Sequence, residues 1–193
     1  MWQYEKKLQF PINIKRPNPK LASFIISQYG GPDGEMGASM RYLSQRFSMK
    51  DDVSKAILTD IGTEELAHLE MVGTLVHQLT KNATTTQIEN SPFAAYYIGN
   101  GRGVYPTASS GQPFDATALS SKSDPITNLV EDMAAEQKAR TVYENILRMS
   151  DDPDVNRVIK YLREREIVHF QRFGEALDRV QNNIGVPKNF YMR

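Results

Sequence analysis

Two short motifs, and the spacing of the acidic residues around them, constrain the fold of this chain more than any other feature. Each motif has the form Glu-x-x-His, and the two copies are Glu65–His68 and Glu166–His169. Residues three positions apart lie on one face of an α-helix, about 5–6 Å from each other, so each motif can present a carboxylate and an imidazole together. A further Glu stands thirty positions before each motif, at Glu35 and Glu136. The two halves of the chain therefore predict two similar helical hairpins.

The turns of these hairpins determine where the acidic residues meet. Polar turns are expected near Lys50 and Asp151, and about fifteen residues of helix, roughly 22 Å, separate each Glu from its turn. Folding each half at its turn places its two Glu at equal height, and packing the hairpins together brings four Glu and two His to one level. This is the ligand set of a carboxylate-bridged dimetal site, in which two helices each supply one Glu and the other two each supply a Glu-x-x-His motif.

The hydrophobic periodicity predicts an all-α fold, a ferritin-like four-helix bundle with an extended N-terminal arm. A long crossover is expected between its second and third helices, because the chain must return along the whole bundle. One domain, 1–193, is expected, with an arm at 1–20, a first helical hairpin at 21–80, a crossover loop at 81–123 and a second helical hairpin at 124–183. A break in the first helix is predicted at Gly30-Gly31-Pro32.

Composition limits the chemistry available to this site. The chain has no Cys, so thiolate ligands, disulfides and Cys nucleophiles are excluded and a metal must be bound by oxygen and imidazole nitrogen. Carboxylates combined with imidazoles suit manganese or non-haem iron. Lys and Arg number 23, as do Asp and Glu, so neither nucleic-acid nor membrane binding is predicted. With no apolar leader segment, a cytoplasmic location is expected.

Several polar residues near the motifs have a simpler explanation than a role in the site. Solvated helix faces are the expected location of His77 and of four acidic residues, Glu64, Glu70, Glu131 and Glu164. Tyr42 follows Glu35 by seven positions, two turns along the same face. Core packing explains this Tyr about as well as a hydrogen bond that supports a metal ligand. Spacing alone does not decide whether Glu166 binds a metal or stands beside it.

The longer stretches around these residues resemble the manganese catalases, and within that family the short spore-coat catalase-like proteins. The resemblance covers nearly the whole chain and is carried by Gly30–Glu35, Tyr42–Gln45 and above all Asp60–Met71. It implies disproportionation of hydrogen peroxide to water and oxygen by two manganese ions. It also implies a homo-oligomer, usually a hexamer, and, for a spore-coat member, association with other coat proteins.

The resemblance further implies a division of roles among the acidic residues. The metal ligands would be Glu35, Glu65, His68, Glu136 and His169. Glu35 would be among the bridging groups, Glu166 would act outside the coordination sphere as a general acid/base, and Tyr42 would steady the first Glu. Two departures bear on this: Ala135 stands where some family members have Arg next to the active site, and the chain ends at Arg193, where larger members continue around neighbouring subunits.

Two other functions fit the same residues. A ferritin-like diiron oxidase or peroxidase would use iron, with Glu166 as an additional ligand. A structural coat protein would use the metal site mainly to brace the bundle. The catalase and iron-site hypotheses differ in the role of Glu166, which binds a metal ion only in the iron site.

Overall fold

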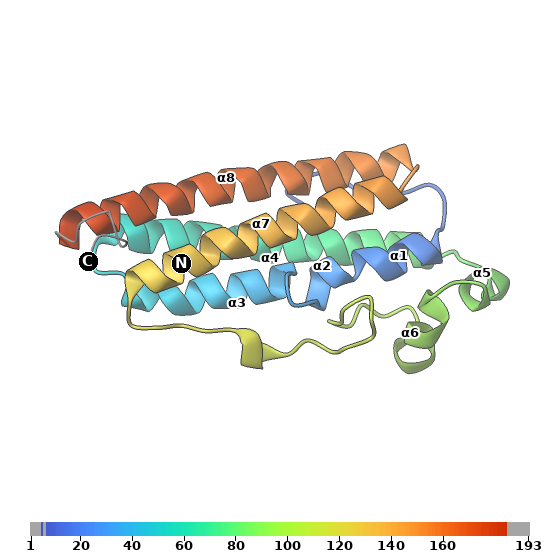
Figure 1. The fold of residues 1–193 in the computed structure, drawn as a ribbon. Helices are drawn as coiled ribbons and strands as arrows, with labels where there is room; N and C mark the ends of the chain where they lie inside the picture. Colours follow the sequence, from blue (N-terminus) through green and yellow to red (C-terminus); the bar gives the residue numbers. More distant parts are fainter. Residues whose placement is uncertain (1–4, 6, 185–193) are drawn as a thin grey trace.

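Four long helical segments lie side by side in the computed structural model, which describes residue 5 and residues 7–184 (Figure 1). The first segment is built from three consecutive helices, α1 (Pro19–Ile25), α2 (Ser27–Gly30) and α3 (Glu35–Gln45). The others are single helices, α4 (Asp52–Thr80), α7 (Pro125–Met149) and α8 (Pro153–Ile184). No strand occurs among the described residues, so the all-α prediction is confirmed.

Side-chain caps determine where the long helices begin. The side chain of Asp51 accepts a hydrogen bond from the backbone N–H of Ser54 at the start of α4, 3.0 Å away. Asp124 accepts from the backbone N–H groups of Ile126 and Thr127, and Pro125 occupies the first position of α7, where its missing N–H costs nothing. Such caps satisfy N–H groups that have no partner within the helix.

The predicted break in the first helical segment lies between α2 and α3. The helix ends at Gly30, and the chain resumes helical structure at Glu35, whose carboxylate thus lies at a helix N-terminus. The electrostatic field at this end of a helix favours negative charge. A Cβ atom on Gly30 would lie 2.3 Å from the backbone nitrogen of Thr107, so the absence of a side chain lets the crossover pack directly against α2.

The crossover returns along the outside of the bundle and contains more helix than the sequence predicts (Figure 1). Its helices are α5 (Thr85–Glu89), α6 (Phe93–Asn100) and the 3₁₀ turn η2 (Ala116–Ala118); a second 3₁₀ turn, η1 (Arg46–Ser48), follows α3. A capping box between Thr84 and Gln87 starts α5. Phe93 is only 1% exposed and anchors α6 to the core. Tertiary burial of this ring stabilises a helix that is too short to show a clear period in the sequence.

The hydrophobic core is divided into two clusters, and the polar residues of the predicted site lie between them. One cluster includes Ile25, Val72 and Ile159. The other includes Leu58, Leu129 and Phe173. Each such side chain contributes about 1.5–3 kcal/mol when fully buried. The two clusters therefore hold the four helices together on both sides of the site. No helix in the described part of the chain is long and apolar enough to cross a membrane.

Candidate metal centre

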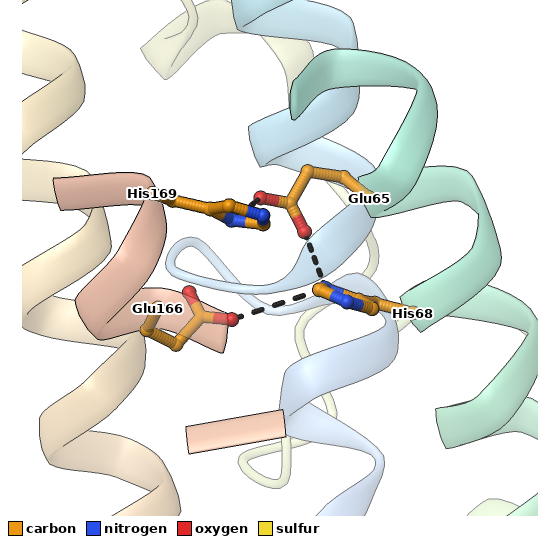
Figure 2. Close-up of side chains that lie close together, drawn as sticks. All are labelled: Glu65, His68, Glu166 and His169. Carbon is orange, nitrogen blue, oxygen red and sulfur yellow. Dashed lines mark hydrogen bonds and ion pairs between the residues drawn. The ribbon is translucent and has the colours of Figure 1, made fainter. Parts of the chain in front are cut away.

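The two Glu-x-x-His motifs face each other across the interior of the bundle (Figure 2). Glu65 and His68 extend from α4, and Glu166 and His169 extend from α8. One potential ligand atom from each of these four residues lies within 4.8 Å of the others, and all four side chains are buried. The i, i+3 spacing places both members of a motif on the inward face of their helix. The arrangement has the size and the chemistry of a metal site.

Glu65 lies at the centre of the cluster, between the two imidazole rings. Its Oε2 atom is 2.7 Å from Nδ1 of His68, and its Oε1 atom is 2.8 Å from Nδ1 of His169. The first contact is a hydrogen bond, whereas the second does not have the orientation of one. The two rings are nearly parallel, with centroids 5.5 Å apart. Both Nδ1 atoms are therefore directed to the same small region of space beside one carboxylate.

The other two helical segments supply the two remaining Glu of the repeated pattern, Glu35 and Glu136, to this group of candidate ligands. Glu35, from α3, has a carboxylate oxygen 4.0 Å from Nδ1 of His68. Glu136, from α7, has one 3.5 Å from Nδ1 of His169. Both side chains are 1% exposed, as is Glu166. The structure thus brings together all four Glu and both His that the sequence singles out.

Burial and mutual repulsion make several of these carboxyl groups hard to ionise. Burial, together with the charge of Glu65, raises the pKa of Glu35 well above its usual value. Burial and the charges of Glu35 and Glu136 do the same to the pKa of Glu166. Glu65 is different, because the charges of His169 and His68 outweigh its burial and lower its pKa. The same attraction to Glu65 raises the pKa of His68 to about 9 and that of His169 to about 12 against the effect of burial.

Several buried polar atoms of this cluster have no hydrogen-bond partner among the described residues. They are Oε1 of Glu65, both carboxylate oxygens of Glu136, Oε1 of Glu166, Nδ1 of His169 and Nε2 of His68. Leaving a buried polar group unpaired costs about 1–3 kcal/mol, and more for a charged one. Hard cations bound by carboxylate oxygens and imidazole nitrogens would satisfy the inward-facing atoms, which are all of these except Nε2 of His68, and would neutralise the excess negative charge. The donor set therefore fits a pair of manganese or iron ions.

Two buried Tyr lie beside the carboxylates of the lone Glu residues. The hydroxyl of Tyr143 donates a hydrogen bond to Oε1 of Glu35. Tyr42, expected to support Glu35, is fully buried, and burial followed by the charge of Glu136 raises its pKa well above the usual value. The helices α3 and α7 run antiparallel (Figure 1), and Tyr143 of α7 contacts Glu35 of α3. Tyr143 follows Glu136 by seven positions, as Tyr42 follows Glu35, so the sequence repeat contained the signal for both.

Glu64 is a site residue that sequence reasoning placed on a solvated face. Its side chain is only 15% exposed, and its carboxylate lies 3.1 Å from Nε2 of His169 and 3.5 Å from Nε2 of His68. Arg165 donates two hydrogen bonds to it, and Gln9 donates a third. One carboxylate thus contacts the outer nitrogens of both imidazoles. The i, i+4 relationship to His68 was visible in the sequence, but the contact with α8 was not.

Known proteins resemble this chain in both sequence and structure. A family model described as manganese containing catalase matches residues 1–192. This chain belongs to the manganese catalase family. Protein CotJC of Bacillus subtilis is 49% identical over 178 residues, which cover 92% of this chain and 94% of CotJC. A probable manganese catalase of Clostridium acetobutylicum is 35% identical over 98% of this chain and 85% of its own length.

Solved structures agree with this family assignment. The crystal structure of wild-type KatB, a manganese catalase from Anabaena, superposes with a TM-score of 0.88 and 32% identity, covering all of this chain and 86% of that one. The predictions of a ferritin-like bundle and of the manganese catalase family are therefore confirmed. Manganese is the cofactor that the family and the Glu/His donor set indicate. In this manganese catalase family member, Ala135 is 6% exposed and directly precedes Glu136.

Proposed function

We propose that this chain is a dimanganese catalase, which converts hydrogen peroxide to water and oxygen. The observation that carries the proposal is the convergence of four buried Glu and two buried His from four helical segments, in a chain matched by the family model over 1–192. The imidazoles and their surrounding carboxylates lie 2.7–4.0 Å apart, close enough to share a pair of ions. No other group of acidic and His residues in the described part of the chain has comparable geometry.

Five residues would hold the ions: Glu35, Glu65, His68, Glu136 and His169. Glu65 is the carboxylate we assign as shared between the two ions, because it alone lies within 3 Å of Nδ1 of both imidazoles. The sequence resemblance places Glu35 among the bridging groups, together with other carboxylates or solvent. Glu35 lies nearer to His68, and Glu136 nearer to His169, as expected of carboxylates that each serve mainly one ion.

Proton movement is the task we assign to Glu166. A bound manganese pair would supply the two electrons that reduce one peroxide molecule and accept two from the next. Reducing a peroxide to two waters consumes two protons, and oxidising a second to oxygen releases two. Glu166 is 1% exposed, its pKa is raised by burial and by Glu35 and Glu136, and its Oε1 lies 3.9 Å from Nδ1 of His68. A carboxyl group in this place can hold a proton between the two half-reactions.

The proposal is tested by loading the purified protein with manganese and measuring oxygen release from hydrogen peroxide. We expect turnover to rise with manganese content up to two ions per chain. Glu166→Gln should keep both ions and lose about 10²–10⁴-fold in kcat. The matched control is Glu164→Gln, since Glu164 lies on the same helix with a side chain 58% exposed. A fully loaded protein without activity would refute the catalase proposal; activity only with iron would favour the diiron alternative.

We also propose that the chain acts as a homo-oligomer, hexameric as the family resemblance implies, and that it is incorporated into the spore coat. Large apolar side chains on its surface support assembly: Phe47 is 76% exposed, Ile98 87% and Met149 62%. The similarity to CotJC supports the coat location. Sedimentation of the purified protein and its localisation in sporulating cells would test the two statements separately.

A further inference from the structure

The N-terminal arm packs against the bundle on the outer side of the candidate metal centre. Residues 7–18 form no helix, and apolar side chains recur at every second position, at Leu8, Phe10, Ile12 and Ile14. All four belong to the hydrophobic cluster that includes Ile25 or pack against it. Side chains at alternate positions of an extended chain point in opposite directions, so one side of the arm faces the bundle and the other faces solvent. We call residues 7–18 the strap.

Hydrogen bonds attach the second half of the strap to α4. The side-chain amide of Gln78 accepts a hydrogen bond from the backbone N–H of Ile14, at 2.7 Å, and donates one to the backbone carbonyl of Ile12, at 3.1 Å. The backbone N–H of Asn18 donates to the carbonyl of Leu79, at 2.9 Å. Backbone groups outside helices and sheets need partners of this kind. These three bonds hold the strap at one position along α4.

Aromatic contacts attach the first half of the strap to α8. The ring of Phe10 stacks on the ring of Tyr161, with centroids 4.6 Å apart and planes 23° from parallel. The guanidinium of Arg157 lies 5.6 Å from the centre of the Phe10 ring. Arg157, Tyr161 and Arg165 follow one another at intervals of four residues, so they form one stripe on α8. Phe10 therefore packs one helical turn before Arg165.

Gln9 connects the strap with the carboxylate that lies behind both imidazoles. Its Nε2 donates a hydrogen bond of 2.7 Å to Oε1 of Glu64. The same oxygen accepts a hydrogen bond from Nε of Arg165, at 2.7 Å, and lies 3.5 Å from Nε2 of His68. The other oxygen, Oε2, lies 3.1 Å from Nε2 of His169. Because one carboxylate contacts both rings, a displacement of Glu64 changes the support of both imidazoles at once.

We propose that the strap controls how tightly the chain retains manganese, with Gln9 as the positioning residue. Gln9 and Arg165 hold Glu64 from two different elements, so the carboxylate stays against Nε2 of both imidazoles. When the strap detaches, Glu64 keeps only Arg165, and its side chain, 15% exposed under the docked strap, opens to water. Water weakens the electrostatic contact between the carboxylate and the imidazoles. The ions therefore leave mainly from the state in which the strap is detached.

Thermodynamic linkage makes this effect reciprocal. If docking of the strap favours manganese binding, manganese must favour docking of the strap by the same factor. Docking can be followed by proteolysis, because trypsin cleaves after Lys and the strap carries exposed Lys7 and Lys15. A protease needs a locally detached segment to reach such bonds. The inference rests on the proposed metal site but not on catalase activity, since both of its readouts are independent of peroxide.

The first test measures the release of manganese from Gln9 variants to an excess of chelator. Gln9→Leu removes the donor at similar size and should release manganese about 2–10-fold faster than the wild type. Gln9→Glu places a second negative charge beside Glu64 and should release it faster still. Gln9→Lys keeps a donor and adds an attractive charge, so it should retain manganese at least as well as the wild type. A merely structural role for Gln9 would not produce this order, because all three variants lose the amide.

The matched control is Asn13→Leu, since Asn13 is an exposed amide residue of the same strap, and its release rate should equal that of the wild type. Gln78→Leu loosens the strap without touching Glu64, and it should also speed release. Manganese content is measured at the start for every variant. Equal release rates for the wild type, Gln9→Leu and Gln9→Glu, each loaded with two ions, would overturn the proposal.

The second test is limited proteolysis with trypsin, with and without manganese. Cleavage after Lys7 and Lys15 should slow when manganese is bound, and it should slow less in Gln9→Leu. Cleavage after Lys122, an exposed residue of the crossover, is the control and should not change. Manganese that leaves cleavage of the strap unchanged would overturn the proposal. A wild-type protein that binds no manganese would overturn both the strap and the metal site, whereas bound manganese without oxygen release would refute the catalase assignment alone.

Discussion

Arg165 of α8 donates two hydrogen bonds to Glu64 of α4, at 2.7 Å and 3.0 Å. These residues immediately precede the Glu of the two Glu-x-x-His motifs, so corresponding positions of the two hairpins carry opposite charges. A paired guanidinium and carboxylate form the strongest kind of side-chain hydrogen bond. The pair holds Glu64 against Nε2 of His169 and His68, and it thereby fixes the orientation of both imidazoles.

Glu64→Gln should weaken manganese binding. The substitution keeps the shape of the side chain but removes the negative charge that faces both imidazoles and binds Arg165. Changes to such supporting partners typically lower metal affinity about 10–100-fold. The measurement is a manganese titration against a competing chelator, with Glu164→Gln as the exposed control. An unchanged manganese affinity would show that Glu64 does not support the ligands.

Tyr143→Phe should destabilise the protein, because the buried carboxylate of Glu35 then loses a hydrogen bond. Removing the hydroxyl takes away a donor from a carboxylate that is 1% exposed. Losing a hydrogen bond to a buried charged group costs about 1–3 kcal/mol, which denaturant unfolding of the manganese-loaded protein can measure. Tyr105→Phe serves as the control because Tyr105 is 49% exposed. Equal free energies of unfolding for both variants would contradict the role given to Tyr143.

The stability of the metal-free protein should fall as pH rises above neutrality. The folded-state pKa of His68 is raised to about 9 from an ordinary value near 6.5, chiefly by Glu65 against burial. A raised pKa stabilises the fold fully below pH 6.5, and this contribution is lost as pH rises through about 9. The raised pKa values of Glu35 and Glu166 act in the same direction, because ionising these buried groups becomes costly at higher pH.

Manganese should largely remove this pH dependence, because bound cations neutralise the carboxylates and displace protons from the imidazoles. Thermal unfolding between pH 6 and 9, with and without manganese, measures both effects. Binding at pH 7 should also release protons, and the release is detectable by calorimetry in two buffers of different ionisation enthalpy. A metal-free protein of constant or rising stability over this pH range would contradict the electrostatic description of the site.

The parts of the structure that the sequence predicted depend on local periodicity and on its repetition. Glu65 and His68 lie on one helix face because of their spacing, and the thirty-residue interval to Glu35 places both helices of a hairpin in register. The sequence places Glu64 on a solvated face, since its partner Arg165 is 101 residues away and no local pattern encodes such a contact. The family resemblance supplied what spacing left open, the choice of manganese.

The crossover shows the same limit of local reasoning. The chain around α5 and α6 is rich in polar and breaker residues, and the sequence predicts a loop there. The capping box of Thr84 and Gln87 was nevertheless present as a short-range signal for α5. What stabilises α6 is the burial of Phe93 in a hydrophobic cluster whose other members, Ile25 of α1 among them, are distant in the chain. Tertiary burial therefore outweighs the weak local helical preference.

Gly30→Ala should destabilise the fold without touching the metal ligands. The added Cβ would lie 2.3 Å from the Thr107 nitrogen and 2.4 Å from Pro106, so α2 and the crossover must separate. Overpacking of this kind typically costs about 1–3 kcal/mol. Gly99→Ala in α6 is the control, because a Cβ there meets no atom within 4 Å. Thermal unfolding should show a lower Tm for Gly30→Ala only; equal values would contradict the close packing.

The most direct measurement for the dimetal site is a crystal structure of the manganese-loaded protein, with anomalous scattering recorded at the manganese absorption edge. We predict two manganese peaks per chain, next to Nδ1 of His68 and of His169, with Glu65 bound to both and Glu166 outside the coordination sphere. A single peak, or coordination by Glu166 with Glu65 bound to one ion only, would contradict the account.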